Sequence, residues 1–189
     1  MAEVLLRSRL ASIEATETVV SSAGLLPPGF PAPPEAIKAM EPYGLDLSAH
    51  RSRRLSIDEV LAADLILGLD RRHVREIVLL NSESWPYTFT LPELVRRGEQ
   101  VGPRRLTVTE GEWVLEAQNG RQRADLVGRS AKDEVADPIG GPSRRYKETA
   151  ALLHNLVGRL VDVLCPGRSD ADRWDPTRTQ RVRSPGSLL

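Results

Sequence analysis

The stretch DLILGLD, residues 64–70, is the part of the chain that decides the fold. Between its two aspartates it is almost continuously apolar, whereas a strand with one face in water alternates apolar and polar residues. Such a run predicts a strand that is covered on both faces, which is typical of a parallel sheet with helices on either side. We therefore expect an α/β fold built around this strand.

Helical patterns lie on both sides of this stretch. Ser56 and Glu59 have the spacing of a capping box at the start of a short helix, and residues 71–80 are amphipathic. Two further strands are expected, a β-branched one over 18–22 and an aromatic one over 85–89. Because three strands are few for this many helices, we expect one central strand of the sheet to be missing. The remaining helices are predicted over residues 2–11, 35–40, from Leu91 onward behind the cap Thr90, 110–118 and, longest, 143–164.

Length and charge narrow the class of protein. The 189 residues are 40% hydrophobic and 28% charged, which predicts one domain over residues 1–165 and a disordered, polar tail over 166–189. Lys+Arg and Asp+Glu number 26 each, so the basic excess of nucleic-acid-binding proteins is missing and no nucleic-acid partner is expected. No apolar run approaches the roughly 20 residues that cross a bilayer, so no membrane partner is expected either. The single cysteine, Cys165, excludes an internal disulfide and indicates a cytoplasmic location.

Several short motifs follow one another in a recognisable order. A helix opens with Met-Ala-Glu at residues 1–3, a predicted strand ends with Ser-Ala-Gly at 22–24, and YGLDLSAHRSR spans 43–53. The apolar strand ends at Asp70, and ADPIGG at 136–141 precedes the last helix. In this order the motifs resemble the low-molecular-weight protein tyrosine phosphatase family, which includes arsenate-reductase-like relatives. The resemblance covers about residues 1–164, and the long insert after Gly98 resembles that of a bacterial branch.

The resemblance implies a three-layer fold of the type I phosphatases and a thiolate mechanism. In the family, a loop of the form Cys, five residues, Arg, then Ser or Thr and Pro directly precedes the Met-Ala-Glu helix. Its thiolate attacks phosphorus and forms a phosphocysteine, which water then hydrolyses. Backbone N–H groups of the loop and the Arg guanidinium hold the phosphate oxygens. The implied partner is a phosphotyrosine protein or another phosphomonoester, and no cofactor is implied.

The resemblance also assigns the site residues by position. Asp137 is the general acid that protonates the leaving phenolate and later the base that activates water, a role worth about 10²–10⁴-fold in rate. Ser22 supports the phosphate loop from behind it, and Pro138 and Ile139 lie on the rim of the cleft. On its residue pattern alone, Asp-Pro is a common turn opener. The three histidines are unclustered in sequence, so no metal site is expected.

The nucleophile of the family is not found in this sequence. Cys165 ends the last helix, and Ala171 stands six places after it, where the family pattern requires Arg. The first, central strand and the phosphate loop are therefore expected to be missing through truncation at the N-terminus, and the chain as given is expected to be inactive. The alternative is a complete, non-catalytic phosphatase-like module that binds partners. A flavodoxin-like binder is a third hypothesis, which would need a cofactor loop that we do not find.

Energetics favours truncation over a complete module. A central strand that buries four apolar side chains contributes about 6–12 kcal/mol, and a whole domain is stable by only about 5–15 kcal/mol. Without it, the strands at 18–22 and 64–69 are expected either to stay about 9–10 Å apart or to close up and pair directly.

Overall fold

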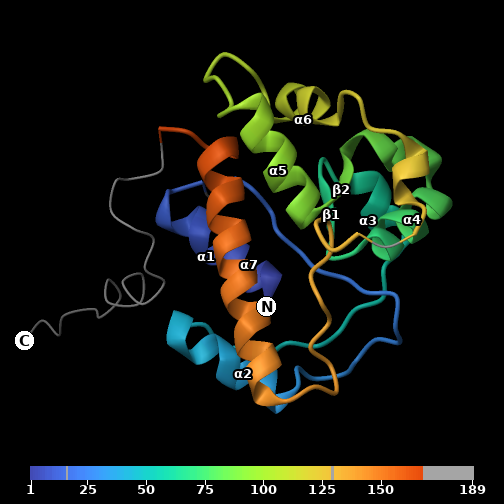
Figure 1. Ribbon diagram of the computed structural model, residues 1–189. Helices are drawn as coiled ribbons and strands as arrows, with labels where there is room; N and C mark the ends of the chain where they lie inside the picture. The colour runs from blue at the N-terminus through green and yellow to red at the C-terminus, as the bar shows by residue number, and fades with distance from the viewer. Residues whose placement is uncertain (16, 129, 168–189) are drawn as a thin grey trace, which may run out of the picture.

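The computed structural model describes residues 1–15, 17–128 and 130–167 (Figure 1). Its longest element is α7 (Ser143–Leu164), and three helices pack directly against it. They are α1 (Ala2–Ser12), α2 (Pro34–Met40) and α5 (Leu91–Val101). Within the described ranges, no helix combines the length and the apolar character that crossing a bilayer requires. Residues 168–189, most of the predicted tail, lie outside the described part.

The sheet has two parallel strands, β1 (Ile66–Gly68) and β2 (Thr88–Thr90). Ile66 pairs with Thr88 and Gly68 with Thr90, and the sheet lies between α5 and α4 (Arg71–Leu80), which both contact it (Figure 1). This confirms the α/β class and the strand inside DLILGLD. All of β2 is buried, whereas Ile66 and Leu67 of β1 are only half-buried.

The predicted strand over residues 18–22 is wrong. This segment forms no strand, and Val19 is 92% exposed. Its carbonyls are satisfied by arginine side chains instead of a neighbouring strand: Arg7 donates to Val20 O at 2.8 Å and Arg53 donates to Ser22 O at 3.0 Å. Within the described residues, β1 pairs only with β2. The segment and β1 therefore did not close up and pair.

The predicted strand over residues 85–89 begins later than expected. Asn81 accepts a hydrogen bond from Glu83 N at 3.1 Å and so starts the 3-10 helix η2 (Ser82–Tyr87), which contains Trp85. The strand β2 then starts at Thr88. The local cap at Asn81 therefore outweighs the β-propensity of the aromatic residues.

The remaining helices start largely where side-chain caps predict. Both predicted caps are confirmed: Ser56 and Glu59 form a capping box at 3.0 and 3.2 Å, and Thr90 caps α5 with Glu93 as its partner. Asp70 caps α4 by accepting from His73 N at 2.9 Å. The other elements are η1 (Glu41–Tyr43), α3 (Ile57–Ala62), α6 (Glu110–Gln118) and η3 (Arg123–Leu126).

One core joins the helical layer to the sheet. The apolar stripe of α7 faces this core, whereas Leu152 on the same helix is 43% exposed. Leu5 of α1 and Phe89 of β2 are fully buried in the same cluster. Other members from α2, α5 and α7 are Met40, Leu94, Val95, Leu153, Leu156, Val157 and Leu160.

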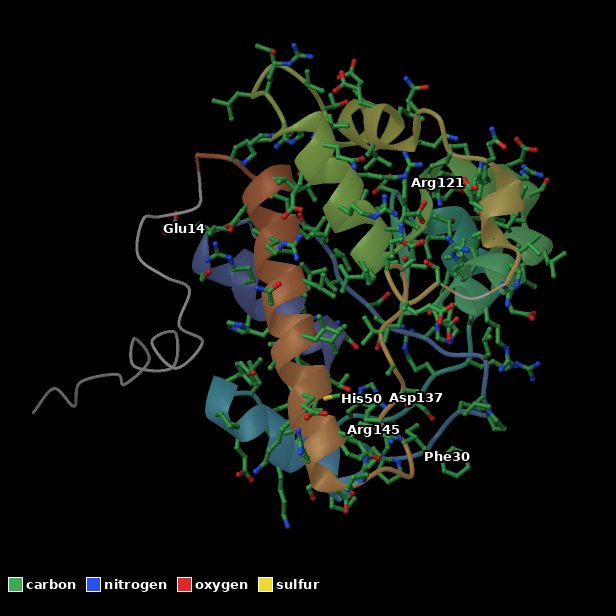
Figure 2. The ribbon with its side chains drawn as sticks, in the orientation of Figure 1. Glu14, Phe30, His50, Arg121, Asp137 and Arg145 are labelled. Atoms are coloured by element: carbon green, nitrogen blue, oxygen red, sulfur yellow. The ribbon has the colours of Figure 1, made fainter. Side chains whose placement is uncertain are left out.

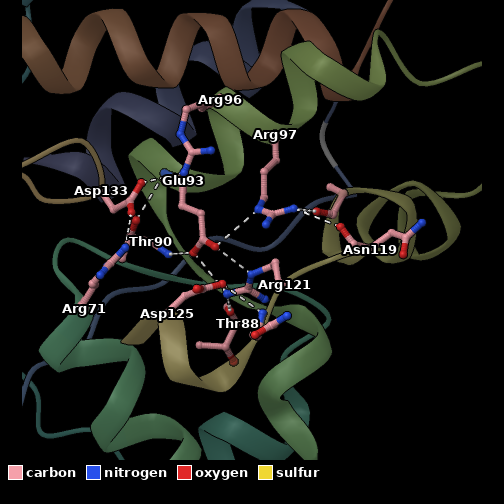
Figure 3. Close-up of polar contacts among 12 residues, drawn as sticks. Arg71, Thr88, Thr90, Glu93, Arg96, Arg97, Asn119, Arg121, Asp125 and Asp133 are labelled. Atoms are coloured by element: carbon pink, nitrogen blue, oxygen red, sulfur yellow. Dashed lines mark hydrogen bonds and ion pairs between the residues drawn. The ribbon is translucent and has the colours of Figure 1, made fainter. Parts of the chain in front are cut away.

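The insert after α5 is fastened to the sheet by Arg121. Its side chain is 1% exposed and donates a hydrogen bond to the Thr88 carbonyl at 2.8 Å (Figure 3). It also donates to the Trp85 carbonyl at 3.2 Å. The guanidinium also stacks 4.0 Å from the centre of the Trp85 ring and 3.8 Å from that of Phe89. Cation–π contacts and buried hydrogen bonds thus hold the insert against β2.

Candidate functional site

Asp137 lies on the loop that follows η3 and leads into the start of α7 (Figure 2). Val135 N donates to Leu69 O at 2.7 Å, which places this loop at the carboxyl end of β1. Ligand sites of parallel α/β sheets occur at this edge. The Asp137 side chain is exposed, and its Oδ1 accepts from Ile139 N at 3.0 Å. The carboxylate is thus preorganised by its own loop and remains open to a ligand.

A tight turn follows Asp137. Gly141 N donates to Pro138 O at 2.9 Å, and Gly140 has a φ of 73°, a conformation that favours glycine. Pro138 is buried beneath the turn, whereas Ile139 is 64% exposed. Of the two residues expected on the rim of the cleft, only Ile139 is presented to solvent.

Ser22 lies beside the first turn of α1. Its hydroxyl donates to a carboxylate oxygen of Glu3, which also pairs with Arg7 at 2.8 Å. Leu5 of α1 and the partly buried Leu67 and Leu69 belong to the same core cluster. The start of α1 and the end of β1 are therefore joined through the core. No hydrogen bond links Ser22 to Asp137 within the part of the chain that the structure describes.

Two features of the Asp137 loop were not expected from the sequence. The first is a buried ion cluster around Asp133, which is 5% exposed. Its carboxylate accepts one hydrogen bond from Arg71 and one from Arg96, each at 2.8 Å. Burial acts to raise the pKa of Asp133, but the hydrogen bonds from Arg96 and Arg71 outweigh it and hold the pKa below its ordinary value. No local pattern signals this cluster, because its members are 25 or more positions apart in sequence.

The second feature is an arginine folded against the turn. A methyl group on Gly141 would lie 3.0 Å from Cδ and 3.2 Å from Nη1 of Arg145, so the absence of a side chain there makes room for it. Arg144 pairs with Glu148 at 2.7 Å, whereas Arg145 has no ion pair within the described residues. A cationic side chain therefore lies against the turn that follows Asp137.

Cys165 cannot act together with Asp137. Asp137 precedes the helix α7 and Cys165 follows it. The helix has 22 residues, so at 1.5 Å per residue its ends lie roughly 33 Å apart. Cys165 is 6% exposed and lines a cavity of about 320 Å³ with Glu14, Thr18 and Arg104. Among the described residues, no group of three or more His, Cys, Asp or Glu side chains could hold a metal ion.

Comparison with known proteins identifies the family. A model of the family described as low molecular weight phosphotyrosine protein phosphatase matches residues 1–97. The chain belongs to this family. The probable low molecular weight protein-tyrosine-phosphatase EpsP of Ralstonia nicotianae is 34% identical over 116 residues, which cover 61% of this chain and 77% of that protein. The resemblance seen in the motif order is thereby confirmed.

Several solved structures share the fold, among them a low molecular weight protein tyrosine phosphatase. The enzyme from T. tengcongensis is 27% identical with a TM-score of 0.60, and the match covers 85% of this chain and 87% of that one. A YwlE mutant from Bacillus subtilis is 25% identical with a TM-score of 0.57, over 85% and 86% of the chains. The tyrosine phosphatase AmsI of Erwinia amylovora, at 20% identity and a TM-score of 0.61 over 87% and 83%, supports the fold alone.

Proposed function

We propose that this chain carries the general acid of a protein tyrosine phosphatase that works through a phosphocysteine. The observation that supports this is the exposed Asp137 carboxylate at the carboxyl end of β1, on a loop tied to Leu69 O at 2.7 Å. A carboxyl group held there protonates a leaving phenolate and then takes a proton from the attacking water. The substrate class is a phosphotyrosine protein or a similar phosphomonoester.

The 189 residues by themselves are proposed to be inactive. The reaction needs a thiolate that displaces the phenolate from phosphorus, and an arginine that binds the phosphoryl oxygens. Cys165 is the one cysteine in the sequence, and Ala171 stands where its partner Arg would be required. Asp137 can assist a nucleophile but cannot replace it.

The open side of β1 supports completion by a strand and loop of the family type. β1 has β2 on one side, and no further strand joins it within the described ranges. Its residues Ile66 and Leu67 are half-buried. A parallel apolar strand at this position would cover these side chains and pair the free edge. The loop that follows it would then lead into the start of α1, beside Ser22.

The proposal also includes the bounds of the domain and the compartment in which the protein works. We take residues 1–165 as the phosphatase domain and residues 166–189 as a tail outside it. The single cysteine suits a reducing compartment such as the cytoplasm. The alternative to catalysis is a phosphatase-like module that binds partners.

The test compares the 189-residue chain with the same chain fused at Met1 to an apolar strand and a Cys-x5-Arg loop of the family pattern. Both are assayed for release of a phenol from aryl phosphates and of phosphate from phosphotyrosine peptides. We expect no hydrolysis above background from the first protein and turnover by the second that is abolished when its loop Cys is changed to Ser. Hydrolysis by the 189-residue chain, or a folded fusion without turnover, would contradict the proposal and favour the binding module.

A further inference from the structure

The carboxylate of Asp133 joins three parts of the molecule. One oxygen accepts from Arg71 at the start of α4 and the other from Arg96 on α5, each at 2.8 Å (Figure 3). Asp133 itself belongs to the loop that leads to Asp137. A buried carboxylate with a guanidinium on each oxygen is held in one orientation by charge-assisted hydrogen bonds.

The three residues between Asp133 and Asp137 have little freedom to move. Val135 is 5% exposed, and its N–H donates to Leu69 O at 2.7 Å. The Thr149 hydroxyl donates to Ala136 O at 3.5 Å, a weak contact to α7. Among the residues that the structure describes, the Asp137 carboxylate accepts a hydrogen bond only from Ile139 N, in its own turn. Its position therefore depends on how the preceding residues are fixed.

The helices α4 and α5 do not need Asp133 in order to stay in place. The first packs on both strands, and the second packs on β2 and α7. Loop residues 130–136 contain one other buried side chain, that of Val135. The two ion pairs therefore contribute more to fixing the position of the loop than to fixing the two helices.

We propose that Asp133 is a positioning residue for the general acid, with Arg71 and Arg96 as its anchors. The proposal rests on the role proposed above for Asp137. Without the carboxylate, Arg71 and Arg96 would face each other as like charges, and the loop would leave its position at the end of β1. A displacement of the reacting group by about 1 Å can cost about 10²-fold in rate.

The first experiment uses the 189-residue chain and does not depend on catalysis. Hydrogen exchange of the Val135 amide is measured by NMR in the parent, in Asp133→Asn and in Asp162→Asn. The last variant is the matched control, since it removes a carboxylate that pairs with the buried Arg9 at 2.8 Å, between α1 and α7. We expect at least about tenfold faster exchange of Val135 in Asp133→Asn only. Equal exchange rates of the Val135 amide in Asp133→Asn and in Asp162→Asn would overturn the proposal that Asp133 anchors the loop.

The second experiment uses the fusion protein with a series of aryl phosphates. We expect Asp133→Asn to lower kcat by about 10²-fold for basic leaving groups and much less for acidic ones, with KM unchanged. When combined with Asp137→Asn, it should add almost no further loss, because both changes remove the same proton transfer. A purely structural role would lower the rate equally for all leaving groups and independently of Asp137, which would overturn the proposal.

The two proposals fail in different ways. If Asp137→Asn has no effect that depends on the leaving group, the proposed role of Asp137 is wrong, and positioning of an acid by Asp133 is wrong with it. If Asp137→Asn shows the expected dependence on the leaving group and Asp133→Asn does not show it, only the positioning role of Asp133 is overturned.

Discussion

Arg121 donates hydrogen bonds to both carboxylate oxygens of Glu93, at 2.7 and 3.1 Å. Glu93 is also the third residue of α5, where it closes the capping box with Thr90, and it lies 3.5 Å from Arg97. Desolvation by burial lowers the pKa of Arg121, and the hydrogen bonds to Glu93 oppose this shift. One carboxylate thus connects the insert, the start of a core helix and the edge of the sheet.

We expect Arg121→Ala to destabilise the fold by about 3–5 kcal/mol, because it leaves the Glu93 carboxylate without its buried partner. Urea unfolding followed by circular dichroism measures the loss. The control is Arg105→Ala, whose side chain is 73% exposed and lies 3.5 Å from Glu116. This change should stay within about 0.5 kcal/mol of the parent. Similar losses in the two variants would show that the Arg121 contacts contribute little.

Gly98→Ala should destabilise the packing of the insert on α5. A methyl group there would lie 2.6 Å from the Trp113 ring and 3.2 Å from Val163, so one of them must move. Overpacking of this kind costs about 1–3 kcal/mol. The matched control is Gly158→Ala on α7, where nothing lies within 4 Å and helix propensity predicts a gain of about 0.8–1.0 kcal/mol. Thermal unfolding and Trp113 fluorescence distinguish the two, and opposite signs are expected.

In the fusion protein, Asp137→Asn should lower turnover by about 10²–10⁴-fold for poor leaving groups and far less for good ones. A basic phenolate needs the proton that Asp137 donates, whereas an acidic one departs without it. The slope of log kcat against leaving-group pKa is the measurement. Asp125→Asn on η3, where the carboxylate accepts a hydrogen bond from Gln122 N at 3.0 Å, serves as the control and should leave the slope unchanged.

Acid should loosen the Asp133 loop before it unfolds the rest. Because the folded-state pKa of Asp133 lies below its ordinary value, the ionised carboxylate stabilises the fold above the ordinary pKa. This contribution is lost as the pH falls through the lowered pKa, where Arg71 and Arg96 then face a neutral carboxyl. Exchange of the Val135 amide, corrected for its intrinsic pH dependence, should therefore accelerate on acidification. The Asp133→Asn variant should show no such dependence, and a parallel response in both proteins would refute the assignment.

Local patterns predicted the elements that depend on neighbouring residues. The strand in DLILGLD, the capping box at Ser56, the cap at Thr90 and the long final helix all follow from periodicity and caps within a few positions. These elements were confirmed because the residues that form the sequence pattern also form the caps and the buried faces of the same elements.

Features that depend on distant residues were not predictable in this way. The β-branched residues at 18–22 suggested a strand, but a strand needs a partner, and arginines from α1 and the 51–54 segment bind its carbonyls instead. The contacts of Arg121 with the sheet and those of Asp133 with two arginines each join residues more than twenty positions apart. The sequence also does not distinguish an exposed arginine from a buried one. The sequence did not indicate that the Asp137 loop would bind the end of β1 through Val135 N and Leu69 O, and the chemical role of Asp137 stays a proposal.

The packing of α1 against α7 has a consequence for the order of events during synthesis. The partner surface of Leu5 and Leu10 includes residues near position 160, so these leucines leave the ribosome long before Leu160 and Val161 exist. During that interval α1 has only an incomplete apolar surface to dock on, and contacts this far apart in sequence form slowly. The nascent chain therefore exposes the first helix to chaperones and proteases until the last helix is released.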